Sequence, residues 1–479
     1  SWGPRLNGTL VRHWDSWIPG SPEFGKERAW SPTTSDVRDF YKMGVTSNIT
    51  LGFLKGGENY DIKTTINNIN TTLINPNNER KQTTISMKGN YNVTDKLKFK
   101  GVFNYQYRYT FNNPQTRGYA GNFNEWWQRQ LSMDRLKNYS QNGQIFSWNM
   151  RSYDNPTPLY WDSPYFEVYE NLNNETKNAI YGSVGLEYDI NDNLKALVDL
   201  RRTFDLTNFD DRKAWGGLAL PWYQELTEQN SFTEAYAQLS YNKNFGDIDI
   251  VSSVGGQTNQ RKYKWLRAES VGGLQIPNYY SVNTSVDTPD YDRDTEHQKL
   301  NSIFASASIG YKSMAYIDGS FRRDWGSTAT ADDNKLNTYG LTGSFIFSQL
   351  LNPGGFITFG KLRAGIGQAP SFPDVYQLQS SYSISNPYGS SVALSVPETL
   401  ANPLLTTTTN TTTIPANDVA YDAGVWTLIC LNGEGCASSA SEPVEVVITP
   451  IPEMPIVQNS GAVCLGSEVT LLAGATYPE

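Results

Sequence analysis

The feature that most constrains the fold is a strict alternation of apolar and polar residues between positions 84 and 109. Ile85, Met87 and Tyr91 share one parity, and Ser, Lys and Asn fill the positions between them. After a short polar turn the alternation resumes and continues from Leu97 to Tyr109. A period of two is that of a β-strand with one apolar and one polar face. The sequence therefore predicts an antiparallel hairpin with two unlike faces.

The same hairpin pattern recurs along the chain. Each arm has about ten residues, which is the length that a tilted strand needs to cross a lipid bilayer. The repeats predict about ten to twelve strands before Pro370. The four further hairpins are expected at residues 180–200, 235–254, 303–321 and 339–366.

The connections between these hairpins are of two kinds. Turns within a hairpin are short, whereas the predicted loops between hairpins are long: residues 110–177, 205–230, 262–299 and 324–337. Short turns at one end and long loops at the other are typical of an outer-membrane barrel. A soluble β-sandwich or propeller is the alternative, but its strands are nearer about five or six residues. We therefore predict an all-β fold, an antiparallel transmembrane β-barrel.

Bulk composition agrees with this prediction. Hydrophobic residues make up 38% of the 479-residue chain, and a barrel looks polar on average because only every second residue faces lipid. The sequence contains no apolar run long enough for a transmembrane helix, and its opening residues do not have the form of a signal peptide. The net charge of −9, with no basic cluster in the sequence, argues against nucleic acid as a partner.

The sequence offers no catalytic constellation. It has no nucleophile elbow, no phosphate-binding loop and no zinc-protease motif, and its two histidines, His13 and His297, lie far apart. The acidic stretch 287–296 lacks the spacing of a calcium loop. We therefore predict a protein that is not an enzyme, with no cofactor and no metal site.

The predicted loop at 110–177 is the strongest candidate for binding, because loops of this length are usually functional. Aromatic faces beside hydrogen-bond donors suit a sugar or a peptide. The alternative, favoured for any single residue, is that the aromatics brace the loop on the barrel rim. A spacing of four between Leu131, Arg135 and Tyr139 predicts a short helix there. The candidate ligand-binding residues are Trp126, Trp127, Arg129, Trp148, Tyr160, Trp161 and Tyr165.

Several stretches resemble the SusC-like family of TonB-dependent outer-membrane transporters of Bacteroidetes. The resemblance spans residues 1–405 and follows the family's order. It is carried by SWGPRLNGT (1–9), NFNEWWQRQLSMDRLKNY (122–139), PTPLYWDSPYFEVYEN (156–171), NLKALVDLRRTF (193–204), YIDGSFRRDWGST (316–328), GKLRAGIGQAP (360–370) and SVPETLANPLL (395–405).

The resemblance implies import of oligosaccharides or peptides across the outer membrane. The implied partners are a SusD-like surface lipoprotein that acts as a lid, TonB, and membrane lipid around the barrel, with loops and tail on the extracellular side. Family members have a plug, a TonB box and a barrel of about 22 strands. Relative to them, the chain begins beyond the plug and leaves the pattern near Leu405. We therefore expect roughly half of the barrel strands, and TonB as a partner only where a plug is present.

The remaining residues are expected to form three segments. Residues 406–415 are Thr-rich and predict a linker. Residues 416–450 resemble the end of an immunoglobulin-like domain and residues 451–479 the start of a second one, as in tandem repeats of Bacteroidetes surface adhesins. A disulfide between Cys430 and Cys436 could close a small hairpin there. This tail leaves open an alternative function, a cell-surface adhesin or structural module displayed by Ig-like repeats.

Overall fold

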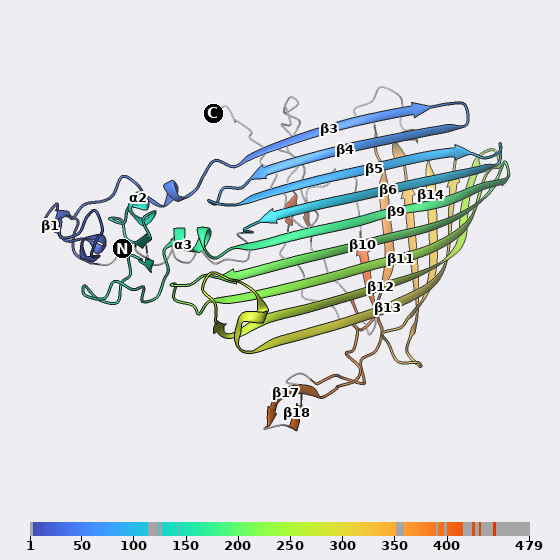
Figure 1. Cartoon of the computed structure of the whole chain (residues 1–479). Helices are drawn as coiled ribbons and strands as arrows, with labels where there is room; N and C mark the ends of the chain where they lie inside the picture. The colour runs from blue at the N-terminus through green and yellow to red at the C-terminus, as the bar shows by residue number, and fades with distance from the viewer. Residues whose placement is uncertain are drawn as a thin grey trace, which may run out of the picture.

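One large antiparallel sheet dominates the structure (Figure 1). The computed structural model describes residues 3–113, 123, 127–141, 143–350, 359–388, 391–396 and 400–414, and the short strands at 424–426, 431–432 and 444–446. Among these residues, fourteen strands hydrogen-bond side by side, with β3 at one edge and β21 at the other. The sheet curls so that β14 lies behind the plane of the first strands in Figure 1. The predicted antiparallel all-β architecture is confirmed, and no pairing between the two edges is described for these residues.

Sequence neighbours pair with one another along almost the whole sheet. Its strands are β3 (Val45–Gly56), β4 (Tyr60–Thr72), β5 (Glu79–Asn92), β6 (Leu97–Phe111), β9 (Asn173–Asn191), β10 (Leu194–Lys213), β11 (Trp222–Asn244), β12 (Ile248–Leu274), β13 (Ser285–Tyr311), β14 (Ala315–Gly326), β15 (Lys335–Phe345), β16 (Leu362–Ser371), β19 (Thr408–Ile414) and β21 (Leu431–Asn432).

The register gives the sheet one apolar and one polar face. Tyr105 lies opposite Ile85 on one side and opposite Ile180 on the other, so apolar residues of successive strands share a face. Nine apolar side chains on this face are 44% to 62% exposed, so this part of the face is an apolar surface without protein cover. The face includes Ile180, Val184, Leu186, Val198, Leu200, Val254, Ile303, Ile309 and Ile317.

The other face carries ionic ladders between neighbouring strands. Glu187 binds Lys100 on one adjacent strand and Lys195 on the other, the latter at 2.8 Å. Arg201 pairs with Glu234 across the β10–β11 boundary at 3.0 Å. Opposite charges on adjacent strands of one face favour this register over its one-residue slip, which would place them on the apolar side.

Side chains that cap their own turns close the short hairpins. The Thr94 Oγ1 accepts a hydrogen bond from the Leu97 amide at 3.0 Å, and the Asn191 Oδ1 accepts one from the Leu194 amide at 3.0 Å. Between β13 and β14, Lys312 and Ser313 have φ of 51° and 54°. Two consecutive left-handed residues match the twist of the flanking strands. The predicted turns at these positions are confirmed.

Most of the longer connections gather at the opposite end of the sheet, which we call the loop end (Figure 1), whereas the β15–β16 connection lies at the short-turn end. Two of the predicted long loops are wrong in extent. Most of 205–230 and 262–299 belongs to strands, and only residues 214–221 and 275–284 connect them. Apolar residues are sparse and irregularly spaced in these strand ends, so no alternation marks them, yet backbone pairing continues. The strands are consequently longer than the expected arms, up to 27 residues in β12 and β13.

The threonine-rich stretch also differs from its interpretation as a linker. Thr408–Ile414 forms β19, antiparallel to β16, as suits β-branched residues. Beyond it, β20 (Gly424–Trp426) pairs with β22 (Val444–Val446). The Ig-like interpretation of the tail stays a prediction, and Cys430 and Cys436 lie outside the described residues. No described helix is long and apolar enough to cross a membrane.

The hydrophobic core lies at the loop end rather than within the sheet. Residues 3–44, which precede the sheet, pack against the long β6–β9 connection, and we call these two segments together the cap. The cap includes the helices η1 (Trp14–Trp17), η2 (Val37–Phe40), α2 (Met133–Leu136) and α3 (Pro164–Tyr169), and the short strands β1 (Leu10–Val11), β2 (Arg28–Ala29), β7 (Ser140–Gln141) and β8 (Gln144–Ile145). The helix expected from Leu131 to Tyr139 is therefore a single turn.

Three asparagines join the cap to the sheet, and we call them the asparagine clasp. Asn112 donates its side-chain amide to the carbonyls of Asn77 and Val168, at 3.0 and 2.8 Å. Asn78 donates in turn to the Asn112 carbonyl at 3.0 Å. Asn77 and Asn112 both have φ of 55°, a conformation that asparagine tolerates better than most residues. The clasp fixes the end of α3 over the β4–β5 turn.

We expect Asn112→Ala to loosen the cap by about 2–3 kcal/mol, because it removes two buried hydrogen bonds and adds backbone strain at positive φ. Asn112→Gly removes the same bonds but accepts the backbone conformation, and should cost about 1 kcal/mol less. Hydrogen exchange of residues 127–172 measures both. Equal protection in wild type and both variants would show that the clasp does not hold the cap.

Candidate functional site

An aromatic cluster forms the centre of the cap. Phe40 of η2 meets the rings of Phe123 and Tyr165 at 5.1 and 5.3 Å, edge to face. Trp127 contacts Phe123 and Trp148 at 5.2 and 5.1 Å. Edge-to-face pairs add to the free energy that burial already supplies. The cluster joins segments about one hundred residues apart into one rigid unit.

A network of two arginines and two carboxylates ties the segment before β3 to α2. Arg135 places its Nη1 3.0 Å from Asp15 and 3.2 Å from Glu23. Arg28 binds the same two carboxylates, with its Nη1 2.9 Å from Glu23. Asp15 is buried, so removing either arginine would leave a poorly solvated charge. A cavity of about 440 Å³ lies beside the network, between η1 and α2.

One asparagine holds the backbone around two of the predicted binding residues. The Asn149 Oδ1 accepts hydrogen bonds from the amides of Tyr160 and Trp161, at 2.8 and 2.9 Å. Its Nδ2 donates to the Trp161 carbonyl at 2.8 Å. Trp161 packs on the aromatic cluster, whereas Tyr160 is 74% exposed. An exposed ring on a fixed backbone presents an apolar face to solvent at little cost in conformational entropy.

The structure separates the other predicted ligand-binding residues into two groups. Trp148 and Tyr165 are buried in the cluster, and Trp127 is half-buried against it. Their rings brace the cap and offer little surface to a ligand. Arg129 is exposed on the cap surface, and Trp126 lies outside the described residues. The residues that can still meet a ligand are therefore Tyr160, Arg129 and the open edge of Trp161.

The β10–β11 connection docks onto the cap through a buried carboxylate. Asp162 accepts the Leu218 amide at 3.1 Å on one oxygen and 3.0 Å on the other. Ala214, of the same connection, packs against Phe166 and Ile145. Burial raises the pKa of Asp162 to about 6, although the Leu218 hydrogen bond opposes this shift. Cap and hairpin tip thus meet around a titratable group.

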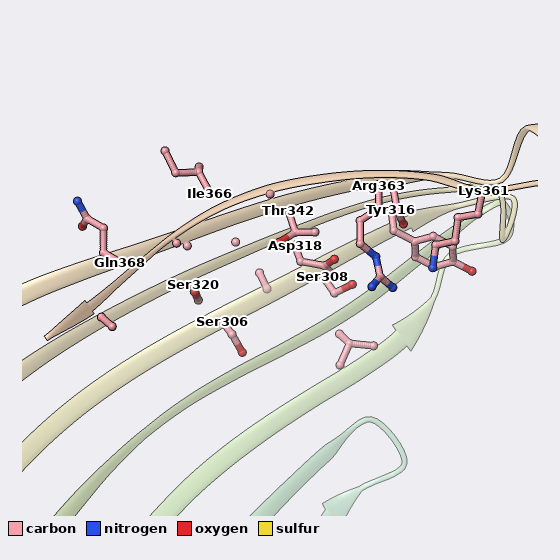
Figure 2. Close-up of a pocket in the computed structure, with 18 residues that line it drawn as sticks. Ser306, Ser308, Tyr316, Asp318, Ser320, Thr342, Lys361, Arg363, Ile366 and Gln368 are labelled. Carbon is pink, nitrogen blue, oxygen red and sulfur yellow. The ribbon is translucent and has the colours of Figure 1, made fainter. Parts of the chain in front are cut away.

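Below the loop end, the polar face of the sheet carries a hollow of about 890 Å³ (Figure 2). Glycines form part of its floor, at Gly340, Gly365 and Gly367. A Cβ at Gly367 would meet no atom within 4 Å, so the floor is open to solvent at this position. The side chains on this face are Ser306, Ser308, Tyr316, Asp318, Ser320, Thr342 and Arg363, whereas Ile366 and Gln368 point to the other face in Figure 2.

The chemistry of this hollow is that of hydrogen bonding. Hydroxyls, one carboxylate and the cations of Lys361 and Arg363 line it, with few apolar side chains. Such a surface suits a polyhydroxylated or zwitterionic ligand, or a polar protein segment. Among the described residues no cluster has the composition of a metal site.

Sequence reasoning missed three kinds of residue at this end of the molecule. Asp15 and Glu23 gave no local signal, because their partner Arg135 lies more than one hundred positions away. Asn112 and Asn149 act through several side-chain hydrogen bonds to backbone groups, which no periodicity encodes. The helix α3 could have been found, since Ser163 precedes Pro164 and accepts from the Tyr165 amide as an N-cap.

Comparison with protein-family models gives no match, and no curated protein matches the sequence. Among solved structures, the chain is similar to the RagAB peptide importer in its closed-closed state, with a TM-score of 0.64 and 14% identity over 84% of this chain and 44% of that one. The open-open state gives a TM-score of 0.62 and 14% identity over 82% and 43%. The ferric-catecholate import receptor Fiu from E. coli gives a TM-score of only 0.45, with 9% identity over 85% and 61%.

These likenesses show the fold. The chain spans less than half the length of the RagAB chains that it matches. The structures named here are described as importers or import receptors rather than as enzymes. The sheet therefore has the fold of part of the barrel wall of the RagAB chains, which agrees with the sequence-based prediction of a barrel.

We expect docking of the β10–β11 connection to weaken as pH rises from about 4 to above 6. The pKa of Asp162 is raised from 3.8 to about 6 in the folded state, so the folded protein holds the proton more tightly than the unfolded chain. Stability from this group is complete below the unfolded pKa and is lost as Asp162 ionises, by about 3 kcal/mol at most.

Asp162→Asn keeps an acceptor for the Leu218 amide and removes the charge. Its hydrogen-exchange protection at residues 214–221, corrected for intrinsic rates, should vary little with pH and should exceed that of wild type at pH 7. Asp154→Asn is the matched control, because Asp154 is exposed in the same connection. A wild-type protection that rises between pH 4 and pH 7 contradicts the prediction.

Proposed function

We propose that this chain forms part of the barrel of a TonB-dependent, SusC-like outer-membrane transporter that imports oligosaccharides or peptides. The observation that carries the proposal is the two-faced wall of paired strands. An apolar face without protein cover is stable only against lipid, and a face of ionic ladders and hydroxyls only against water. A wall with both separates a membrane from an aqueous passage.

The loop end supports the direction of import. In outer-membrane barrels the long connections face the outside of the cell, and here they carry the cap. The cap's rigid core and its exposed Tyr160 suit the first contact with a substrate. The hydroxyl-lined hollow lies further along the same polar face. The likeness in fold to a peptide importer favours a peptide over other nutrients, and the sugar alternative is kept because the polar face would suit either.

A SusD-like lipoprotein lid and TonB are the proposed partners. Support for the lid comes from the sequence resemblance at 122–139 and 156–171, the two stretches that build the cap. A preformed, packed cap offers a surface on which a lid can rest without prior folding. TonB would act through a plug, as in the family that the sequence resembles.

Cell fractionation tests the proposal. The protein should float with the outer membrane, and protease added to intact cells should cut at the loop end first. A SusD-like protein should co-purify from mild detergent. A soluble, secreted product would overturn the barrel and favour the adhesin alternative, in which the Ig-like tail is the working part.

A charge on the apolar face should impair insertion, whereas the same charge one residue away should not. Val198 is 58% exposed on the apolar face, and Leu197 has the opposite parity on the same strand. Val198→Lys should destabilise the inserted state by about 2–4 kcal/mol, and Leu197→Lys by much less. Urea titration of the protein refolded in phosphatidylcholine vesicles measures both. Equal losses would mean that the apolar face does not meet lipid.

We expect Tyr160→Ala to weaken ligand binding about tenfold, because it removes the exposed ring from the cap. Tyr160→Phe keeps the ring and should bind as wild type does. The probes are a tryptic peptide mixture and a maltooligosaccharide mixture, and bound species are identified by mass spectrometry. Tyr279→Ala, an exposed tyrosine of the β12–β13 connection, is the control. Unchanged binding in Tyr160→Ala would remove this residue from the site.

A further inference from the structure

The long hairpin of β12 and β13 carries opposite charges on its two faces beyond the apolar band. On the polar face of β13, Asp290, Asp292, Asp294 and Glu296 follow one another at every second position. Arg267 lies among them, 3.5 Å from Asp290. The other face of the same segment is basic. Successive residues of a strand point to opposite sides, so a single hairpin separates the two charges.

The basic residues of the second face form one surface, which we call the outer basic patch. The register places Lys262 opposite His297, and Lys299 opposite Gln260. On β14, Arg323 lies opposite Ile303. It points to the same face as Ile317 and Phe321, which precede it at even spacings on the strand. Trp325 is two residues beyond Arg323 on β14 and therefore points to the same face. Lys335 of β15 lies opposite Trp325 and shares this face. The patch consists of Lys262, Lys264, Arg293, Lys299, Arg323 and Lys335.

Acidic residues do not balance this patch among the described residues. No ion pair involves any of its six cations within the part of the chain that the structure describes, and all but Arg323 are exposed. The Arg323 Nε is buried without a hydrogen-bond partner, while its guanidinium lies 5.3 Å from the Trp325 ring. In a chain with a net charge of −9, six cations on one face without an ion-pair partner among the described residues form a pronounced local excess.

The patch begins where the apolar band ends. On β13 the apolar parity runs from Tyr311 to Ile303 and continues to Lys299. At about 3.3 Å per residue, Tyr311 and Ile303 are about 26 Å apart along the strand. A tilted strand crosses an apolar band about 25 Å tall over about this length or slightly more. Lys299 therefore lies at the level of the lipid headgroups on the loop side.

We propose that the outer basic patch binds the phosphate headgroups of anionic lipid in the leaflet at the loop end. The inference rests on the proposed membrane placement and adds a lipid partner to it. Lysine and arginine side chains beside an apolar surface can keep their stems against the acyl chains and direct their charges to the phosphates. Cations close to the membrane surface attract anionic headgroups additively.

The geometry favours lipid over a soluble anionic ligand. The patch lies on the side of the sheet that faces away from the polar hollow, so a ligand passing along the polar face does not meet it. It is also continuous with the apolar face through Ile303, which is 49% exposed and lies opposite Arg323. A molecule that covers both surfaces needs an anionic head and an apolar body.

The experiment compares wild type with a variant that carries Lys262→Gln, Lys264→Gln, Arg293→Gln and Lys299→Gln. The full chain is refolded into vesicles that mix phosphatidylcholine and phosphatidylglycerol, extracted in neutral detergent, and analysed by mass spectrometry for retained lipid. Wild type should retain phosphatidylglycerol above its share of the vesicle. Loss of four charges should lower this enrichment on the order of tenfold.

The control variant carries Lys63→Gln, Lys88→Gln, Lys98→Gln and Arg261→Gln, four cations with the parity of the polar face. It has the same net charge as the patch variant and should keep the wild-type enrichment. Equal enrichment in all three proteins, or an equal loss in both variants, would overturn the inference. So would release of the lipid by phosphate buffer but not by chloride of equal ionic strength, since free phosphate would then be the ligand.

Failure of the proposed function gives a different result. If wild type does not enter the mixed vesicles, the membrane placement itself is wrong. If it enters them but retains no excess of phosphatidylglycerol, the membrane placement stands and the lipid site does not.

Discussion

Backbone pairing on a sheet with two unlike faces is the constraint on which the rest of the molecule depends. Each of the central strands satisfies its amide and carbonyl groups on both neighbours, so the sheet needs no interior side-chain core to persist. Side chains are then free to serve the two surroundings. The register that places Tyr105 beside Ile85 and Ile180 also aligns Glu187 with its lysines on the opposite side. One choice of register fixes both surfaces, and a slip by one residue would exchange them.

The cap is stabilised by different interactions from those of the sheet: buried aromatic rings and side-chain hydrogen bonds to backbone carbonyls. Its attachment is distributed over separate hairpin tips, at the asparagine clasp and at Asp162. These tips belong to the same continuous sheet, so the sheet fixes the position of the cap. The packing of Phe40 against Tyr165 then brings the segment before β3 into the same unit.

The alternating parts of the fold could be predicted from sequence, and the non-alternating parts could not. Between Ile85 and Tyr109 polarity alternates with position, so the sequence predicts the strands, the turn between them and the face to which each side chain points. Between Asp205 and Lys213 apolar residues are sparse, so the sequence predicts a loop at Thr207 and Asp211 although they continue β10. The cap was recognisable only as an aromatic-rich connection. The pairs that build it, such as Asp15 with Arg135, depend on tertiary contact, and the burial of Trp148 and Tyr165 reflects the same contact.

The continuous hydrogen-bonded length of β12 and β13 has a mechanical consequence for the mouth of the wall. A two-stranded ribbon whose register is unbroken from the short turn near Tyr311 to Glu269 resists bending in the plane of the sheet. A push on its tip is transmitted along the ribbon to the far end of the sheet instead of being absorbed as loop motion. The rim at this hairpin therefore behaves as a lever, and a molecule that settles on the rim can exert torque on the wall beneath.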